Sequence, residues 1–178
     1  MLQAEVGGGG RVDAGGGLQK PGYLIRDFVL TSALGARVQI SDYRGRSNLV
    51  LVFAGQAGIE FDVLRDAAKR YQNFTEQDAV VVAVFPYNSQ ETDPLKIWAA
   101  LPFVALADDD GIVHSLYGAV DEHGRPSSLI YVTDRFGEIV SVYDARGGKN
   151  LPSTDEILKV LEFINHQCPE CEPPEWPR

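Results

Sequence analysis

Two short stretches of the chain are apolar without interruption, and the segment between them has a different period. Residues 48–53 and 78–85 are runs of mainly aliphatic and aromatic side chains, which is typical of strands covered on both faces of a sheet. Between them, the apolar residues of 59–74 recur every three or four positions, the spacing of an amphipathic helix. A strand, a helix and a strand in this order predict a right-handed crossover between parallel strands.

Shorter patterns extend this unit along the chain. Residues 129–133 and 138–143 are rich in β-branched and aromatic side chains, and the loop between them ends in a glycine that suits a hairpin. The last helix is predicted to begin at Ser153 or Thr154, where Ser-Thr-Asp-Glu forms a capping box. The other expected elements are a strand at 37–40, a short helix at 93–100, a strand at 103–107 and a short helix at 111–117.

This succession of elements predicts an α/β fold, with a central mixed sheet of about five strands and helices on both faces. Seven of the 18 glycines fall within residues 1–20, so this segment is expected to be a flexible leader. No predicted strand precedes these glycines and no phosphate-loop motif follows them, so a phosphate-binding loop is not expected. Residues 21–167 form the predicted domain, and the proline-rich residues 168–178 form a tail.

The charge of the chain narrows the choice of partners. Its 178 residues include 25 Asp and Glu against 16 Lys and Arg, which gives a formal net charge of -9. An acidic surface disfavours nucleic acid and anionic membranes, and neither is expected as a partner. Neither a run of about 18 apolar residues nor a signal-peptide pattern is visible, which predicts a cytoplasmic protein. No motif calls for a cofactor.

Four motifs occur in an order that resembles the peroxiredoxin branch of the thioredoxin-fold superfamily, the alkyl hydroperoxide reductase and thiol-specific antioxidant redoxins. Residues 22–30, Gly-Tyr-Leu-Ile-Arg-Asp-Phe-Val-Leu, are similar to the family's opening G-x-x-x-x-D-F-x-L. Residues 35–45 resemble its G-x-x-v-x-L-s-d-y-r-G, and 49–53 resemble the vvLvF strand that follows. Residues 131–139 are similar to its f-v-i-D-x-x-G-x-i hairpin. The resemblance spans 21–165 and implies a thioredoxin-like fold.

The resemblance also implies a cysteine near the start of the helix that follows the first buried strand, where the helix dipole lowers the pKa of a thiol. This sequence has no cysteine before Cys168, so the peroxidatic site of the family is predicted to be absent. Counted from Phe53, the Pro, Thr and Cys of the peroxiredoxin motif fall on Gly55, Ile59 and Asp62. The C-x-x-C of thioredoxins falls on Gly58 and Phe61. Counted back from Asp134, the position of the peroxiredoxin arginine or the thioredoxin cis-proline falls on Ser128, with Arg125 and Pro126 close by.

The only two cysteines lie in the tail, as Cys168-Pro-Glu-Cys171. This C-x-x-C spacing lets two sulfurs close a small disulfide ring, as redox-active dithiols do. The end of a helix and the neighbouring Glu170 and Glu172 disfavour the thiolate form. The first functional hypothesis is a thiol-disulfide oxidoreductase or antioxidant accessory protein that uses Cys168 and Cys171 with a thioredoxin-type reductant.

Two other interpretations of the tail stay open. His166, Cys168 and Cys171 offer three ligands for zinc, with a fourth from another histidine, a carboxylate or a second chain. Alternatively, the tail packs Trp176 against the domain, and its cysteines are reduced or joined in a local structural disulfide. The second functional hypothesis is therefore a non-catalytic binding or scaffold relative of the family. The resemblance alone suggests a homodimer.

The remaining polar candidates have simpler explanations. Asp108-Asp-Asp-Gly111 is expected to be an acidic turn after a strand, because it lacks the alternating oxygen ligands of a calcium loop. His114 and His123 are too isolated in the sequence to be assigned as general bases. Glu60 and Asp62 are expected to cap and stabilise the first turn of the helix that follows the first buried strand.

Overall fold

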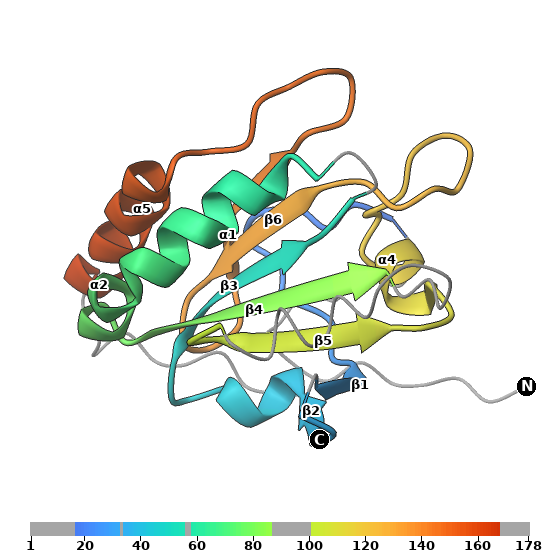
Figure 1. Cartoon of the computed structure of the whole chain (residues 1–178). Helices are drawn as coiled ribbons and strands as arrows, with labels where there is room; N and C mark the ends of the chain where they lie inside the picture. The colour runs from blue at the N-terminus through green and yellow to red at the C-terminus, as the bar shows by residue number, and fades with distance from the viewer. Residues whose placement is uncertain (1–16, 33, 56–57, 87–100, 168–178) are drawn as a thin grey trace, which may run out of the picture.

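The computed structural model describes residues 17–32, 34–55, 58–86 and 101–167. These residues form a mixed sheet with helices on both faces, as the sequence predicts (Figure 1). The sheet has seven strands rather than about five, in the order β2-β1-β5-β4-β3-β6-β7. The strands are β1 (Val29–Ser32), β2 (Arg37–Gln39), β3 (Asn48–Phe53), β4 (Ala79–Pro86), β5 (Val104–Asp108), β6 (Leu129–Thr133) and β7 (Ile139–Asp144).

The centre of the sheet is parallel and its two sides are antiparallel. Strand β4 pairs in parallel with β3 and with β5, which confirms the predicted crossover. On one side, β6 runs antiparallel to β3, and β7 runs antiparallel to β6 through the predicted hairpin, where Gly137 has a φ of 84°. On the other side, β1 pairs antiparallel with β5 and β2. Every residue of β3 is buried, in agreement with its uninterrupted apolar sequence.

The predicted helix over 59–74 is two helices. Helix α1 (Glu60–Lys69) ends before Arg70, and α2 (Tyr71–Glu76) follows at once. Arg70 has a φ of -110° and a ψ of 22°, which lies outside the helical region. Its guanidinium Nη2 lies 2.7 Å from a carboxylate oxygen of Asp155. The apolar period continues across the break, which is why the sequence does not reveal it.

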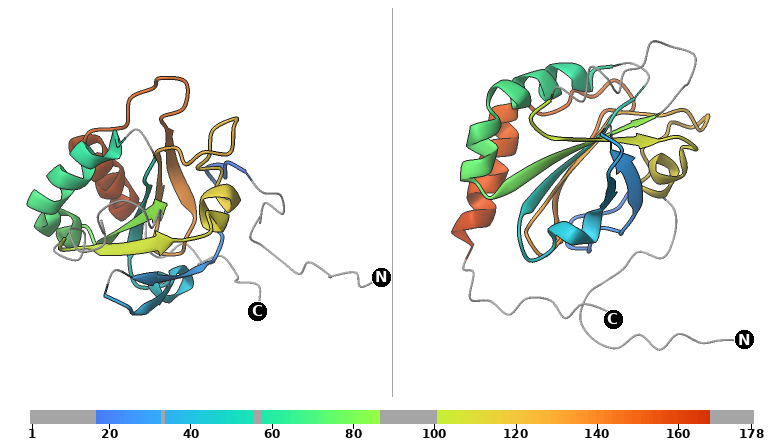
Figure 2. Two further views of the ribbon diagram at one scale, coloured as in Figure 1. Left: turned by 45° about the vertical axis from the view of Figure 1, so that its right-hand side comes forward. Right: turned by 60° about the horizontal axis from the view of Figure 1, so that its bottom comes forward.

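Each face of the sheet carries its own apolar layer. Helices α1, α2 and α5 (Thr154–His166) cover one face (Figure 2), where Leu64, Phe74 and Leu161 are fully buried. The other face is covered by the 3-10 helix η1 (Ile40–Tyr43), by α4 (Ile112–Leu116) and by the segment before β1. Both faces of the sheet at β3 and β4 are therefore covered by other elements, as expected for parallel strands in an α/β fold.

The chain is already packed before Pro21. Gln19 is 1% exposed, and its backbone N–H donates to Tyr131 Oη at 3.0 Å. Residues 17 and 18 cross directly over Gly118, where an added Cβ would lie 2.3 Å from the backbone nitrogen of Leu18. Gly118 also has a φ of 69°, so glycine is required there for two reasons. The end of the expected leader is thus part of the folded domain.

Two short helices were expected around 93–100 and 111–117. The helix expected at 93–100 lies outside the described residues. The helix expected at 111–117 is the shorter α4, which follows Gly111 in the left-handed conformation. Among the helices of the described ranges, none combines the length and apolar character needed to cross a bilayer.

Helix α5 begins with the predicted capping box. The Ser153 hydroxyl accepts from the backbone N–H of Glu156 at 3.3 Å, and the Glu156 carboxylate accepts from the backbone N–H of Ser153 at 2.7 Å. Replacing Ser153 by alanine is expected to lower the free energy of unfolding by about 1 kcal/mol, because one first-turn N–H loses its acceptor. Urea unfolding followed by circular dichroism measures this loss. An equal effect of Ser141→Ala, outside any helix, would contradict the capping role.

Candidate functional site

The segment after β3 meets the residues before β6 at one end of the sheet. In the β3–β6 ladder Phe53 pairs with Leu129, so Gly55 and Ser128 lie just beyond its last pair. A Cβ added to Gly55 would lie 2.6 Å from the backbone nitrogen of Ser128, so the two backbones touch. The sequence-based positions Gly55 and Ser128 therefore lie in contact with each other. None of the peptide bonds in the described ranges is cis, including the one before Pro126.

Glu60 provides a buried carboxylate at this place. It is 0% exposed, and its Oε2 accepts a hydrogen bond from the Ser128 hydroxyl at 2.5 Å. No described residue forms a hydrogen bond with its other oxygen, Oε1. The expectation that Glu60 caps α1 is wrong, since no side chain caps this helix and the Glu60 side chain is committed to Ser128. A carboxylate thus occupies the first turn of the helix at which the resemblance implies a thiolate.

The other predicted site positions face outward. Asp62 does not cap α1 either: its side chain is 89% exposed and lies 3.3 Å from Arg65 in a surface ion pair. Gly58 has a φ of 67°, and an added Cβ would lie 2.8 Å from the Phe61 ring, so a side chain there is disfavoured. Ile59 and Phe61 are 44% and 40% exposed, which is unusual for large apolar residues. The start of α1 therefore exposes apolar and acidic side chains together.

A second buried polar pair supports the segment between β3 and α1. His114 and Asp108 are both fully buried, and His114 Nδ1 lies 2.5 Å from Asp108 Oδ2. The other ring nitrogen, Nε2, lies 3.1 Å from the Ala54 carbonyl. Both ring nitrogens therefore lie within hydrogen-bond distance of an oxygen atom. The pair thereby ties α4 to the residue before Gly55.

The same carboxylate holds the start of α4. Its two oxygens accept the backbone N–H groups of Val113 at 3.2 Å and His114 at 2.7 Å. Burial opposes ionisation of Asp108, but hydrogen bonds from the side chain and backbone of His114 hold its pKa below the usual value. Asp108 does begin a turn, with its carbonyl accepting from Gly111. The sequence-based view of an acidic turn that needs only solvent is wrong for this first aspartate, and His114 is not isolated.

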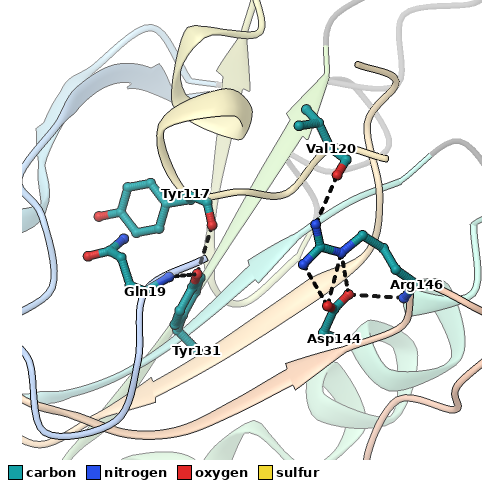
Figure 3. Close-up of polar contacts among 6 residues, drawn as sticks. All are labelled: Gln19, Tyr117, Val120, Tyr131, Asp144 and Arg146. Atoms are coloured by element: carbon teal, nitrogen blue, oxygen red, sulfur yellow. Dashed lines mark hydrogen bonds and ion pairs between the residues drawn. The ribbon is translucent and has the colours of Figure 1, made fainter. Parts of the chain in front are cut away.

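An arginine fixes the loop that follows β7 (Figure 3). Arg146 Nη2 and Nε lie 2.6 and 2.8 Å from the two carboxylate oxygens of Asp144, and Nη1 donates to the Val120 carbonyl at 3.2 Å. Nearby, Tyr131 Oη accepts from Gln19 and donates to the Tyr117 carbonyl at 2.7 Å. Burial raises the pKa of Tyr131 to about 12, so it stays neutral. The Arg146 contacts therefore join the start of the loop after β7 to the backbone at Val120.

Three hollows join along this end of the sheet, with volumes of about 740, 380 and 710 Å³. The first and second share Ile59 and Ala145, and the second and third share Asp121 and Arg125. We call these three adjacent hollows together the end groove. They are lined by the start of α1, the residues before β6, and the loops 119–127 and 145–153. In Figure 1 the loop after β7 lies at the top and the loop before β6 lies at the upper right.

Arg125 is not free to attract a ligand across the middle of the end groove. Its Nη2 lies 2.7 Å from Asp121 Oδ2, and its Nε donates to the same oxygen at 2.8 Å. These side-chain hydrogen bonds, together with one from the Arg125 backbone, lower the pKa of Asp121 to about 2. The pair is therefore ionised and mutually neutralised near neutral pH.

Comparisons with known proteins agree with this geometry. Residues 21–142 match the model of the AhpC/TSA family. The chain belongs to this family. No protein with a curated function matches the sequence.

Solved structures of the AhpC/TSA family and its relatives share the fold. AhpC of Mycobacterium bovis has a TM-score of 0.67 at 18% identity, over 86% of this chain and 97% of that one. The peroxidoxin BcpB of Mycobacterium tuberculosis has a TM-score of 0.66 at 19% identity, over 82% and 97%. The reduced 2-Cys peroxiredoxin of Plasmodium vivax has a TM-score of 0.65 at 15% identity, over 82% and 96%.

The matched AhpC/TSA segment contains no cysteine. Cys168, Cys171 and Trp176 lie outside the described residues, so neither the dithiol nor the zinc interpretation of the tail is tested here. His166 Nδ1 lies 2.7 Å from the Glu162 carbonyl within α5. Throughout the described ranges, no three His, Cys, Asp or Glu side chains gather where they could hold a metal ion.

Proposed function

We propose that this chain is a binding member of the AhpC/TSA family, and that the site at the start of α1 holds a partner rather than reducing peroxide. The observation that carries the proposal is the buried Glu60–Ser128 hydrogen bond at this position, in a domain without cysteine. Peroxide reduction needs a nucleophile that gives up two electrons, as a thiolate does when it becomes a sulfenic acid. A carboxylate and a hydroxyl cannot supply them.

Peroxide turnover tests this proposal directly. With thioredoxin, thioredoxin reductase and NADPH supplied, the full chain is expected to consume hydrogen peroxide or cumene hydroperoxide no faster than the mixture without it. The Cys168→Ser and Cys171→Ser variants are expected to give the same rate as the native chain. Turnover well above background would overturn the binding role, whichever cysteine it required.

A thiol-disulfide oxidoreductase is the second candidate, supported by the C-x-x-C spacing of the only two thiols. Helix α5 has 13 residues, a length of about 20 Å. Both cysteines follow the end of this helix in the sequence, so this candidate is proposed as a site separate from the start of α1.

The dithiol reaction has a clear electron balance. As the sulfur–sulfur bond between Cys168 and Cys171 is reduced to two thiols, two protons and two electrons come from the dithiol of a thioredoxin-type reductant, which becomes a disulfide. If this activity exists, the native chain equilibrates with thioredoxin at a defined potential and Cys168→Ser does not. A native chain whose disulfide does not exchange with reduced thioredoxin would remove this candidate. Elemental analysis for zinc, before and after chelation, tests the interpretation of the tail as a zinc site.

A further inference from the structure

The start of α1 exposes an apolar side chain. Ile59, the residue before the helix, already has helical dihedral angles, with a φ of -67° and a ψ of -20°. The backbone N–H of Phe61 donates to the Gly58 carbonyl at 3.1 Å, so this first-turn donor has an acceptor. Ile59 is 44% exposed and is therefore available as an apolar contact.

Ile59 stands where two hollows of the end groove meet. It lines both the 740 Å³ hollow beside α5 and the 380 Å³ hollow over Ser128. Val63 and Leu151 add apolar surface to the larger hollow. A compact small molecule would fill one hollow, whereas an extended polypeptide places successive side chains along a line and can pass from one hollow to the next. The shape of the end groove therefore favours a peptide segment.

The accessible charge of the end groove is mainly negative. Asp62 and Asp66 line its α1 wall, and their side chains are 89% and 47% exposed. Their ion pairs, with Arg65 at 3.3 Å and Arg70 at 3.7 Å, are exposed and weak. Arg125 and Arg146, which line the other hollows, are already held by Asp121 and Asp144.

The opposing cation is Lys149 on the facing loop, which is outnumbered by the two aspartates. The whole chain carries a net charge of -9, which adds to the attraction of a basic ligand.

We propose that the end groove binds an extended segment of a protein partner, with an apolar side chain seated at Ile59 and a Lys or Arg beside Asp62 and Asp66. The inference rests on the binding role proposed above and adds the class of partner. Hydrophobic contact at Ile59 supplies affinity, and the two aspartates select the charge of the segment.

Fluorescence anisotropy with a defined probe tests the peptide class. The probe is a short fluorescein-labelled peptide with a central leucine flanked by lysines and otherwise made of serine. A second probe replaces the lysines by glutamates. The full-length chain is expected to bind the lysine probe at least about tenfold more tightly than the glutamate probe at low salt, with the gap narrowing as salt is added. Equal binding of both probes would overturn the charge assignment.

Matched variants locate the binding. Ile59→Glu is expected to weaken binding of the lysine probe about tenfold or more, as removal of a central apolar contact does. Ile112→Glu is the control, because Ile112 is 63% exposed on α4 and lines none of the three hollows. The double change Asp62→Asn and Asp66→Asn should weaken the same probe, and Asp42→Asn, exposed on η1, should not. Unchanged binding by Ile59→Glu would overturn the site.

Two further measurements exclude other occupants. If removal of residues 1–16 tightens probe binding strongly, the chain's own leader fills the end groove and the partner proposal fails. If sedimentation detects a dimer that Ile59→Glu dissociates, the end groove is a contact between two copies and the proposal fails too. If the peptide probes do not bind as expected and the chain also shows no peroxide turnover, only this class of partner is rejected. The proposed binding role is then unaffected.

Discussion

Replacing Asp108 by alanine is expected to lower the free energy of unfolding at neutral pH by about 3 to 5 kcal/mol, because three buried polar groups lose their partner at about 1 to 3 kcal/mol each. The change removes the 2.5 Å contact with His114 and the acceptors of two first-turn N–H groups of α4. All of these groups are buried, so water cannot replace the lost oxygens without opening the fold. Guanidinium unfolding of the native chain and the variant measures the difference.

The pH dependence of that difference has a defined sign. The pKa of Asp108 is lowered in the folded chain, so its ionised form stabilises the fold at pH values above its ordinary pKa of 3.8. That stabilisation is lost as the pH falls below 3.8 and through the folded-state pKa. The gap between the native chain and Asp108→Ala should therefore be wide at pH 7 and narrow below pH 4. A gap that widens in acid would contradict an ionised Asp108 carboxylate in the folded chain.

Asp108→Asn is the matched control that separates the loss of the negative charge from the loss of the hydrogen-bond acceptor. An asparagine can keep one oxygen for the N–H groups of α4, so its cost should be smaller than that of alanine and nearly independent of pH. The site should respond as well, because His114 Nε2 contacts the Ala54 carbonyl next to Gly55. Binding at Ile59 is thus expected to weaken in Asp108→Ala at temperatures where the variant is still folded.

The fold was predictable from the sequence because its centre follows simple periodicities. The buried strands β3 and β4 are continuous apolar runs, and the hairpin β6–β7 joins two segments rich in β-branched and aromatic residues by a turn that ends in glycine. The sequence does not reveal β1, because its four residues, Val-Leu-Thr-Ser, do not alternate between apolar and polar. The break at Arg70 was missed because the apolar spacing runs through it.

The site was predictable only where it follows from strand pairing. Gly55 and Ser128 meet because they extend an antiparallel ladder whose ends can be counted along the chain. The contact between Glu60 and Ser128 depends on the direction in which α1 leaves the sheet, which no periodicity specifies.

The sequence predicts that the Asp108 side chain is exposed to solvent, because this residue begins a run of three aspartates. Only this first one is buried, at the end of β5, and the sequence alone does not distinguish it from its neighbours.

Replacing Ser128 by alanine is expected to lower the free energy of unfolding by about 2 to 3 kcal/mol, because the buried carboxylate of Glu60 loses its hydrogen-bond donor. The Glu60 side chain is 0% exposed, and no described residue forms a hydrogen bond with its second oxygen. In the variant, neither carboxylate oxygen of Glu60 keeps a hydrogen bond from the part of the chain that the structure describes. Urea unfolding gives the loss. Ser127→Ala is the control, since Ser127 lines the same 380 Å³ hollow and is not the donor to Glu60.

A double-mutant cycle separates the hydrogen bond from the cost of burying the carboxylate. If Ser128 compensates Glu60, then Ser128→Ala should cost much less in a Glu60→Leu background, because no buried carboxylate remains to be satisfied. The doubly substituted chain is expected to be as stable as the native chain, or more stable. Equal costs of Ser128→Ala in both backgrounds would contradict the coupling. A more stable double variant that also binds the lysine probe less well would indicate that this polar pair is kept for the shape of the end groove at the expense of stability.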